Sequence, residues 1–457
     1  MSKQTNSSTE QSRSVPPLRF PEFQGDWEKK KIGEVSEINP TNKNLPNKFI
    51  YIDLESVSNG ELLKENEITI ENAPSRAQRI LQANDVLFQM VRPYQKNNLF
   101  FNKEGIYVAS TGYAQIRTKQ NPKYLFQYLH FQTFVDRVIE RCTGTSYPSI
   151  NSNDLSNIEF SYPSIEEQTK IASFLTAVDE KIQALKKKHS LLEQYKKGVM
   201  QRLFCLHHDS LDLHDEHDFE KKNQQKKSRQ SDKSSESRFR PLRFKDENGN
   251  DFPAWEVKKL GEVFSFKVTN SFSRDNLNYE KGEVRNIHYG DIHTKFKTLF
   301  DIQKETVPFI NQEIAVQKIS EDNYCKKGDM IFADASEDLN DVGKSIEIVN
   351  VNDNKVLAGL HTILARPHEN LFSTGFAGYL FKSNSLRTQI QKEAQGSKVL
   401  SISASRLSNI LIPIPSLPEQ TLIANFLSAI DEKINHTAMQ IQKTEVWKKG
   451  LLQKMFV

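Results

Sequence analysis

The sequence predicts an α+β protein in which two divergent domains are separated by two long antiparallel coiled-coil helices, with internal pseudo-two-fold symmetry. Residues 163–204 return without a gap as residues 415–456, and 20 of the 42 positions are identical. Each copy has apolar residues at seven-residue spacing, which is typical of a long helix packed lengthwise on another helix. Each copy also follows a region where strand-like runs precede helical ones, the order of an α+β domain.

The chain before the first domain is predicted to be a disordered leader over residues 1–15. Its sequence, MSKQTNSSTEQSRS, has no apolar core and is therefore not a secretory signal. No later stretch approaches the ~20 apolar residues that a membrane span requires. The three cysteines are scattered without metal-ligand spacing, so neither a disulfide framework nor a zinc site is expected. These features predict a cytoplasmic protein.

The two divergent domains are predicted over residues 16–162 and 238–414. Both open with a tryptophan, Trp27 or Trp255, followed by a short helix near Gly33 or Gly261. Strand-like runs then lie at 49–57, 85–91, 105–111 and 113–118 in the first domain, and at 283–290, 329–335, 344–350 and 355–365 in the second. One helix follows each set, over 124–142 and 376–394.

The repeated segments, 163–204 and 415–457, are predicted to be the two long helices. The first begins after Ser164, a suitable N-cap, and the stripe of the second is weakened by Thr437 and Thr444. Neither helix has a better partner in the sequence than the other, and an antiparallel pair satisfies both stripes. Identical residues at solvent-facing positions indicate a shared docking partner as well. The residues predicted to pair the helices or dock subunits are Gln168, Ile171, Phe174, Leu175, Val178, Ile182, Gln420, Ile423, Phe426, Leu427, Ile430 and Ile434.

The segment between the first long helix and the second domain, residues 205–237, is predicted to be a flexible linker. It is poor in apolar residues and rich in charge and serine. Its histidines, His207, His208, His214 and His217, fit a solvated tether better than a metal site.

Polar side chains suited to base edges and phosphates gather in the loops of both domains. The candidates for DNA contact in the first domain are Arg76, Arg79, Gln89, Arg92, Tyr94, Lys96, Asn97, Asn98, Ser146 and Tyr147. Those in the second domain are His288, Tyr289, His293, Lys295, Lys297, Ser336, Asn340, Lys344, His361 and Lys398.

No catalytic or metal-binding residue is predicted. Gly343-Lys344-Ser345 resembles a phosphate-binding loop, but Asp338 stands where that motif needs a glycine, and a carboxylate there repels phosphate. The Asn-Pro-Pro-aromatic and Asp-Pro-Pro-aromatic motifs of amino-methyltransferases do not occur in the sequence. Acids such as Asp334 are expected to belong to a surface loop.

The doubled pattern of Leu-Ser-Asn-Ile, Glu-Gln, Ile-Ala-x-Phe-Leu, Asp-Glu-Lys-Ile and Lys-Lys-Gly resembles the specificity subunit of type I restriction-modification systems. The resemblance runs from about Val15 to Val457. It implies two target-recognition domains, each reading one half of a split, asymmetric site on double-stranded DNA, with the helices setting the spacer. It also implies two methyltransferase subunits docked on the helices and two ATP-dependent motor-nuclease subunits.

The resemblance further implies that this chain supplies no bond chemistry and holds no cofactor. S-adenosylmethionine, ATP and Mg are expected on the partner subunits. Two alternatives stay open on the sequence alone: a self-contained DNA methyltransferase or nuclease, and a coiled-coil scaffold for proteins only.

Overall fold

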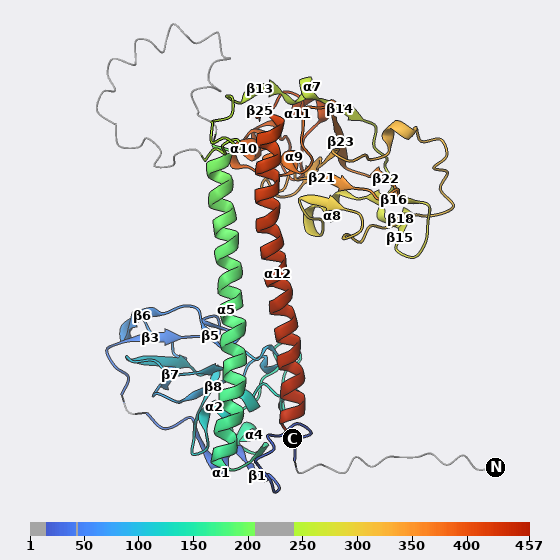
Figure 1. Ribbon diagram of the computed structural model, residues 1–457. Coiled ribbons are helices and arrows are strands. Elements are labelled where there is room, and N and C mark those ends of the chain that lie inside the picture. Colours follow the sequence, from blue (N-terminus) through green and yellow to red (C-terminus); the bar gives the residue numbers. More distant parts are fainter. Residues whose placement is uncertain (1–14, 43, 206–241) are drawn as a thin grey trace, which may run out of the picture. The chain divides into compact units, whose positions relative to one another are not determined.

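The computed structural model describes residues 15–42, 44–205 and 242–457 (Figure 1). The chain divides into two compact units, one containing the residues up to Lys188 together with Thr437–Val457, the other containing His189–His436. The predicted leader lies outside the described residues except for Val15, and the predicted linker except for Cys205.

The first domain contains two four-stranded sheets, in the orders β2-β11-β8-β9 and β6-β3-β10-β7. The antiparallel pair β1 and β12 brings the beginning and end of the domain together. Its elements are β1 (Glu28–Lys31), α1 (Ile32–Val35), β2 (Ser36–Ile38), β3 (Lys48–Ile52), β4 (Val57–Ser58), β5 (Glu61–Leu62), β6 (Asn66–Thr69), β7 (Ala77–Ile80), β8 (Val86–Gln89), β9 (Leu99–Phe100), β10 (Tyr107–Ser110), β11 (Tyr113–Thr118), α2 (Pro122–Tyr128), α3 (Gln132–Ile139), α4 (Ser152–Ser156) and β12 (Glu159–Tyr162).

The second domain repeats this plan with a five-stranded sheet, β14-β23-β19-β21-β17, and a four-stranded sheet, β15-β18-β16-β22. The pair β13 and β25 again closes the domain. Its elements are β13 (Glu256–Lys259), α7 (Leu260–Val263), β14 (Phe264–Lys267), β15 (Leu277–Asn278), β16 (Val284–Ile287), α8 (Tyr289–Thr294), β17 (Leu299–Asp301), β18 (Phe309–Ile310), β19 (Met330–Ala333), β20 (Ala335–Ser336), β21 (Ser345–Asn350), β22 (Lys355–Ala358), β23 (Thr362–Pro367), α9 (Phe376–Leu380), α10 (Asn384–Glu393), β24 (Leu400–Ser401), α11 (Ala404–Leu407) and β25 (Leu411–Ile414).

Several predicted elements are each split by a turn, including the strand predicted over 49–57, which ends at Ile52 as β3 and resumes at Val57 as β4. The helix predicted over 124–142 is two helices, α2 and α3, and the one over 376–394 is α9 and α10. Both halves of each pair bury apolar residues in the same core, so their sequence looks continuous. The strand predicted over 355–365 reverses after Ala358 and becomes β22 and β23. The run predicted over 283–290 ends as a strand at Ile287, and its last residues begin α8.

The two long helices are α5 (Ile165–Leu203) and α12 (Leu417–Met455). In the first unit, Asp179 Oδ1 lies 2.5 Å from Lys448 Nζ, and Lys186 lies 2.8 Å from Glu445. The partner's number falls as the α5 number rises, so the helices run antiparallel (Figure 1). In the second unit, Lys196 Nζ donates to Asp431 Oδ1 at 2.6 Å. Asp179 and Asp431 occupy the same position of the repeat, as do Lys448 and Lys196, which agrees with the predicted pseudo-two-fold symmetry.

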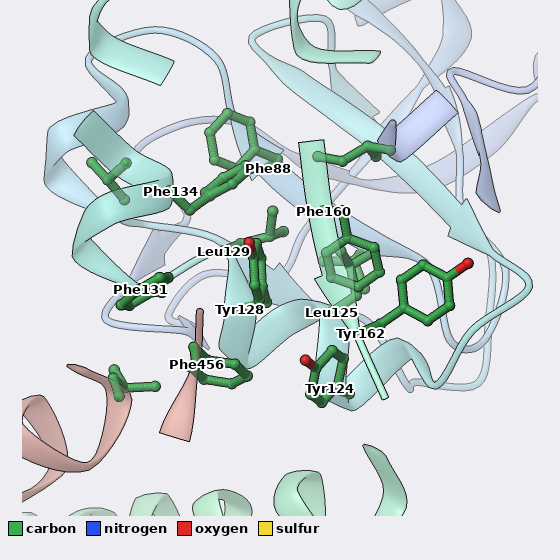
Figure 2. Close-up of a cluster of buried hydrophobic side chains, with 14 of the residues drawn as sticks. Phe88, Tyr124, Leu125, Tyr128, Leu129, Phe131, Phe134, Phe160, Tyr162 and Phe456 are labelled. Atoms are coloured by element: carbon green, nitrogen blue, oxygen red, sulfur yellow. The ribbon is translucent and has the colours of Figure 1, made fainter. Parts of the chain in front are cut away.

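Each domain core contains the end of the helix that follows the other domain. Phe456, at the end of α12, packs 5.4 Å from the rings of both Tyr124 and Tyr128 (Figure 2). Phe204, its equivalent at the end of α5, packs 6.1 Å from Phe376 and 6.3 Å from Trp255. Each unit therefore needs both helices to complete its apolar interior.

The repeated Glu-Gln pair fastens each helix to its own domain. Glu167 is buried and accepts two 2.8 Å hydrogen bonds from the Arg19 guanidinium. Glu419 does the same with Arg243, at 2.6 and 2.9 Å. Gln168 and Gln420 are also buried, and their side chains bond backbone groups of the preceding domain. Both glutamines therefore act inside the units.

The apolar seam of α5 is buried toward both ends of the helix and half-exposed at Leu185 and Leu192, whereas Thr437, in the middle of the α12 seam, is buried. Ile171, Leu175, Val178 and Ile182 are buried, as are Ile423, Leu427 and Ile430, whereas Phe174, Phe426 and Ile434 are half-buried. Leu185 and Leu192 are also half-buried. The residues predicted to pair the helices thus form two buried stretches.

A Glu167→Gln substitution is expected to destabilise the protein by about 2 kcal/mol, because it leaves the half-buried Arg19 guanidinium without its counter-charge and one of its two hydrogen-bond acceptors. The exposed neighbour offers a matched control, and Glu166→Gln is expected to change stability by less than about 0.5 kcal/mol. Urea unfolding of the three proteins measures the difference. Equal midpoints for the two variants would contradict the structural role of the pair.

We expect the folding stability of the protein to depend on pH because of His130, which lies in the turn between α2 and α3. Burial and then the nearby Lys448 lower the pKa of its imidazole to about 4, below the ordinary 6.5. The unfolded chain therefore takes up the proton first as the pH falls, and stability is lost between roughly pH 6.5 and 4. Acidification from pH 7 to 5 should cost up to about 2 kcal/mol through this group.

A His130→Asn variant should lose less stability than the unmodified protein over the same pH change. Asparagine can still donate to the Phe126 carbonyl, which His130 Nδ1 contacts at 2.7 Å. Thermal unfolding followed by circular dichroism at pH 7 and pH 5 measures both losses. Identical losses would show that His130 does not carry the effect.

Candidate nucleic-acid interface

The candidate interface is built in the same way in both domains. A buried strand, β8 or β19, is preceded by a buried aspartate, Asp85 or Asp329, that binds an arginine of the neighbouring strand at 2.8–2.9 Å. After the strand, the chain pairs with the segment that is repeated in the sequence, through Val91 and Ser149 in the first domain and β20 and β24 in the second. A divergent loop and a repeated loop therefore meet at one place in each domain.

In the first domain this meeting brings Arg92 and Tyr147 together. Arg92 has a left-handed backbone, φ 54°, and its N–H donates to the Pro148 carbonyl at 2.8 Å. Its guanidinium carbon lies 4.2 Å from the centre of the Tyr147 ring, a cation–π distance. Ser146 and Tyr94 are exposed nearby in sequence. This pair offers a cation and an aromatic face to one ligand.

Three of the predicted contact residues instead hold the loop that carries Arg92. The Gln89 backbone N–H donates to Asn98 Oδ1 at 2.9 Å, and its side chain bonds Gln95 and the Asn97 backbone. Gln89 and Asn98 are both buried. They position the loop, and Asn97 joins it to Asn59.

The remaining cations of the first domain are placed differently from Arg92. Lys96 Nζ donates to the His130 carbonyl and to Gln132 Oε1, at 3.1 and 2.8 Å, and lines a cavity of about 720 Å³ between the domain and the helix pair of its unit. Arg79 on β7 is half-buried, and desolvation lowers the pKa of its guanidinium. Arg76 precedes the same strand and is exposed. The structure does not bring these residues into contact with Arg92.

In the second domain the structure gathers three predicted histidines around the ring of a fourth predicted residue, Tyr289. Tyr289 begins α8, and its ring centre lies 4.6 Å from that of His288, 5.3 Å from that of His361 and 6.0 Å from that of His293. His293 Nε2 lies 3.1 Å from the carbonyl of Ala335, in β20. This cluster therefore joins the strand that carries Ser336.

Two charged side chains, Lys344 and Asp334, hold residues of this cluster in place. Lys344 Nζ donates to the His293 carbonyl at 2.7 Å, and His361 Nδ1 lies 3.2 Å from Asp334 Oδ1. Burial raises the pKa of the Asp334 carboxyl. Asp334 is thus a half-buried partner of His361, and the expectation of an acidic surface loop is wrong for it.

His288 is a neutral group near pH 7. Its side chain caps α8 by accepting the Gly290 N–H at 3.2 Å. Burial, followed by the charge of Arg274, lowers its pKa to about 4. It offers ring edges rather than a positive charge.

Arg274 and Asp291 were not predicted from the sequence. Their ion pair anchors α8 to the segment that carries Arg274. The buried Asp291 carboxylate accepts from Arg274 at 2.7 and 2.8 Å and lies 2.9 Å from Lys295 Nζ. Lys295 is therefore occupied with an internal carboxylate. Lys297, Asn340 and Lys398 are exposed. No sequence spacing linked Arg274 to Asp291, because they meet only through the fold.

Each helix pair also exposes one large aromatic residue at the same place of the repeat. Trp447 is 49% exposed and packs edge-to-face on Phe174, which in turn packs on Phe20. Tyr195 of the other unit is 54% exposed, and there Phe426 packs on Phe244. We call Trp447 and Tyr195 the exposed aromatic pair.

The described part of the chain contains neither a membrane-spanning helix nor a metal-binding cluster of side chains. Within it, no helix combines the length and apolarity needed to cross a membrane. Over residues 15–42, 44–205 and 242–457, no three His, Cys, Asp or Glu side chains are grouped to hold a metal ion.

Comparison with known proteins gives one consistent family. The chain is 25% identical over 461 residues to the type I restriction enzyme MjaVIII specificity subunit of Methanocaldococcus jannaschii, covering 97% of this chain and 94% of that protein. It is also 24% identical over 194 residues to the HindI specificity subunit of Haemophilus influenzae, covering 39% of this chain and 41% of that one.

Solved structures share the fold. The type I restriction-modification S subunit from M. genitalium superposes with a TM-score of 0.54 at 14% identity, covering 97% of this chain and 99% of that one. A chain from a structure of complex assembly and conformational transition in the type I R-M system gives 0.53 at 20% identity, covering 94% and 97%.

The family described as type I restriction modification DNA specificity domain matches residues 24–194 and again 254–445. The two matches include most of both domains and of both long helices, and the chain therefore belongs to the type I restriction-modification DNA specificity family.

Proposed function

We propose that this chain is the DNA-reading subunit of a type I restriction-modification complex. Each domain reads one half of a bipartite, asymmetric site on double-stranded DNA, and the two helices set the spacer. The chain itself is non-catalytic. Methylation and cleavage belong to two methyltransferase and two motor-nuclease subunits, which carry S-adenosylmethionine, ATP and Mg.

One observation carries the proposal: equivalent junctions of the two domains hold unlike side chains. The first has the Arg92 guanidinium against Tyr147, and the second has Tyr289 among three histidines. Guanidinium groups bind guanine edges or phosphates, whereas a neutral imidazole, such as that of His288, donates and accepts single hydrogen bonds. Two such surfaces on one repeated frame suit two different half-sites.

The exposed aromatic pair supports docking of two copies of one partner. Trp447 and Tyr195 stand at the same position of the two helix copies, and each precedes the repeated Lys-Lys-Gly. Exposed aromatic residues are the commonest strong contacts of protein interfaces. Solvent-facing residues that are identical in both copies, such as Lys181 and Lys197, supply the polar rim.

Replacing residues 40–150 with the corresponding segment of a specificity subunit of different target should change one half-site only. The other half-site is expected to stay the same, because residues 254–445 are untouched. Mapping methylated adenines across the genome of cells with the assembled methyltransferase measures both half-sites and the gap. A change in both halves would contradict independent reading.

A Trp447→Ala or a Tyr195→Ala substitution should each weaken one of two methyltransferase-subunit sites by about tenfold or more, since truncating a central interface aromatic typically costs at least ~2 kcal/mol. Val446→Ala is the matched control. Val446 is 65% exposed, but its equivalent is Gln194, so a partner that binds both copies alike cannot depend on it.

Analytical ultracentrifugation measures the result at a subunit concentration several times the unmodified dissociation constant, where an unmodified site is mostly filled and a weakened site is mostly empty. Each aromatic variant should bind about one methyltransferase subunit, and the Val446→Ala protein should bind two. Two subunits on all three variants would exclude this docking site.

A further inference from the structure

The repeated loops at residues 144–149 and 396–401 each hold a large apolar side chain out in solvent. Tyr147 is 63% exposed and Val399 is 54% exposed. They occupy the same position of the repeat, three residues after Gly144 and Gly396. The exposed apolar tip is thus a shared feature of two domains that otherwise differ.

Backbone geometry closes each of these loops tightly around its glycine. Gly144 and Gly396 have φ of 90° and 129°, which side chains other than glycine rarely adopt. A Cβ on Gly144 would lie 3.2 Å from the Tyr147 carbonyl oxygen, and one on Gly396 would lie 2.0 Å from that of Val399. Paired hydrogen bonds between Thr143 and Ser149 close the first loop, and the second is closed in the same way. Each tip is therefore a fixed projection.

We infer that Tyr147 and Val399 enter the DNA base stack as wedges, one beside each half-site. The inference rests on the proposed function. The tips belong to the repeated segment, so they suit a task that is common to both half-sites rather than base identification. Apolar side chains between base steps unstack and kink DNA, and aromatic rings stack on any base. Arg92, held against the Tyr147 ring, supplies a cation beside the backbone phosphates.

Such unstacking would help the partner reaction. A methyltransferase must take its target base out of the duplex, and a locally unstacked step makes that cheaper. The two wedges differ in kind, because Tyr147 offers a π-face and Val399 does not. The first half-site is therefore expected to be more strongly distorted than the second.

The test uses the full chain assembled with its methyltransferase subunits and duplexes carrying 2-aminopurine beside either half-site. The half-site that changes on replacement of residues 40–150 is taken as the first. The Tyr147→Ala complex should lose the 2-aminopurine fluorescence increase beside the first half-site only, with site-specific binding weakened roughly 5- to 150-fold. Tyr147→Phe should keep both, and Val399→Tyr should raise the signal beside the second half-site.

Ile70→Ala is the control, because Ile70 is 42% exposed outside these loops, and it should change neither signal. Thermal unfolding should be the same for all variants, since the tips are exposed. Unchanged fluorescence for Tyr147→Ala on bound DNA would overturn the inference alone. Loss of methyltransferase-subunit binding with an unchanged DNA signal would also overturn it. Failure of the unmodified complex to bind its site would overturn the proposed function instead.

Discussion

Each domain of this protein is completed by a helix that belongs to the other half of the chain. Tyr124 and Tyr128 pack on Phe456, and Phe376 and Trp255 pack on Phe204. Neither core is closed by residues close to it in sequence. Three of the repeated positions follow from this constraint, because the same aspartate, lysine and phenylalanine serve both junctions. The domains can differ elsewhere as long as these contacts remain.

The junction is electrostatic as well as apolar. Asp179 binds both Lys448 of the other helix and Gln127 of its own domain, and Asp431 binds Lys196 and Tyr379 in the same way. One carboxylate therefore ties three segments together in each unit. Such a rigid base suits the proposed function, because hydrogen bonds to base edges tolerate little displacement.

The long helices and the doubled architecture could be predicted from the sequence, since a 42-residue repeat and a seven-residue stripe are local signals. Strands β8, β10 and β11 lie within runs that the sequence predicted as strand-like, although their pairing was not predicted. The breaks before α3 and α10 were missed, since the apolar pattern continues across them. His288 and His293 are close to Tyr289 in sequence, but the contact of Arg92 with Tyr147 and that of His361 with Tyr289 join residues about 55 and 70 positions apart. Only the folded sheet brings these residues together, and no spacing in the sequence encodes it. Gln89 and Asn98 looked like readers because amides suit base edges, but burial gave them an internal role.

Gly33 and Gly261 have a consequence for how such chains diversify. A Cβ on either would come within 3.0 and 2.9 Å of the Cβ of Ser156 and Ser408, serines of the repeated Leu-Ser-Asn-Ile. In each domain the segment near the beginning, which contains Gly33 or Gly261, therefore packs tightly against the repeated segment near the end. Coding sequence between these two points keeps this fit when it is exchanged. The helix end that completes the core, at Phe456 or Phe204, lies outside the exchanged stretch and stays with the frame that receives it.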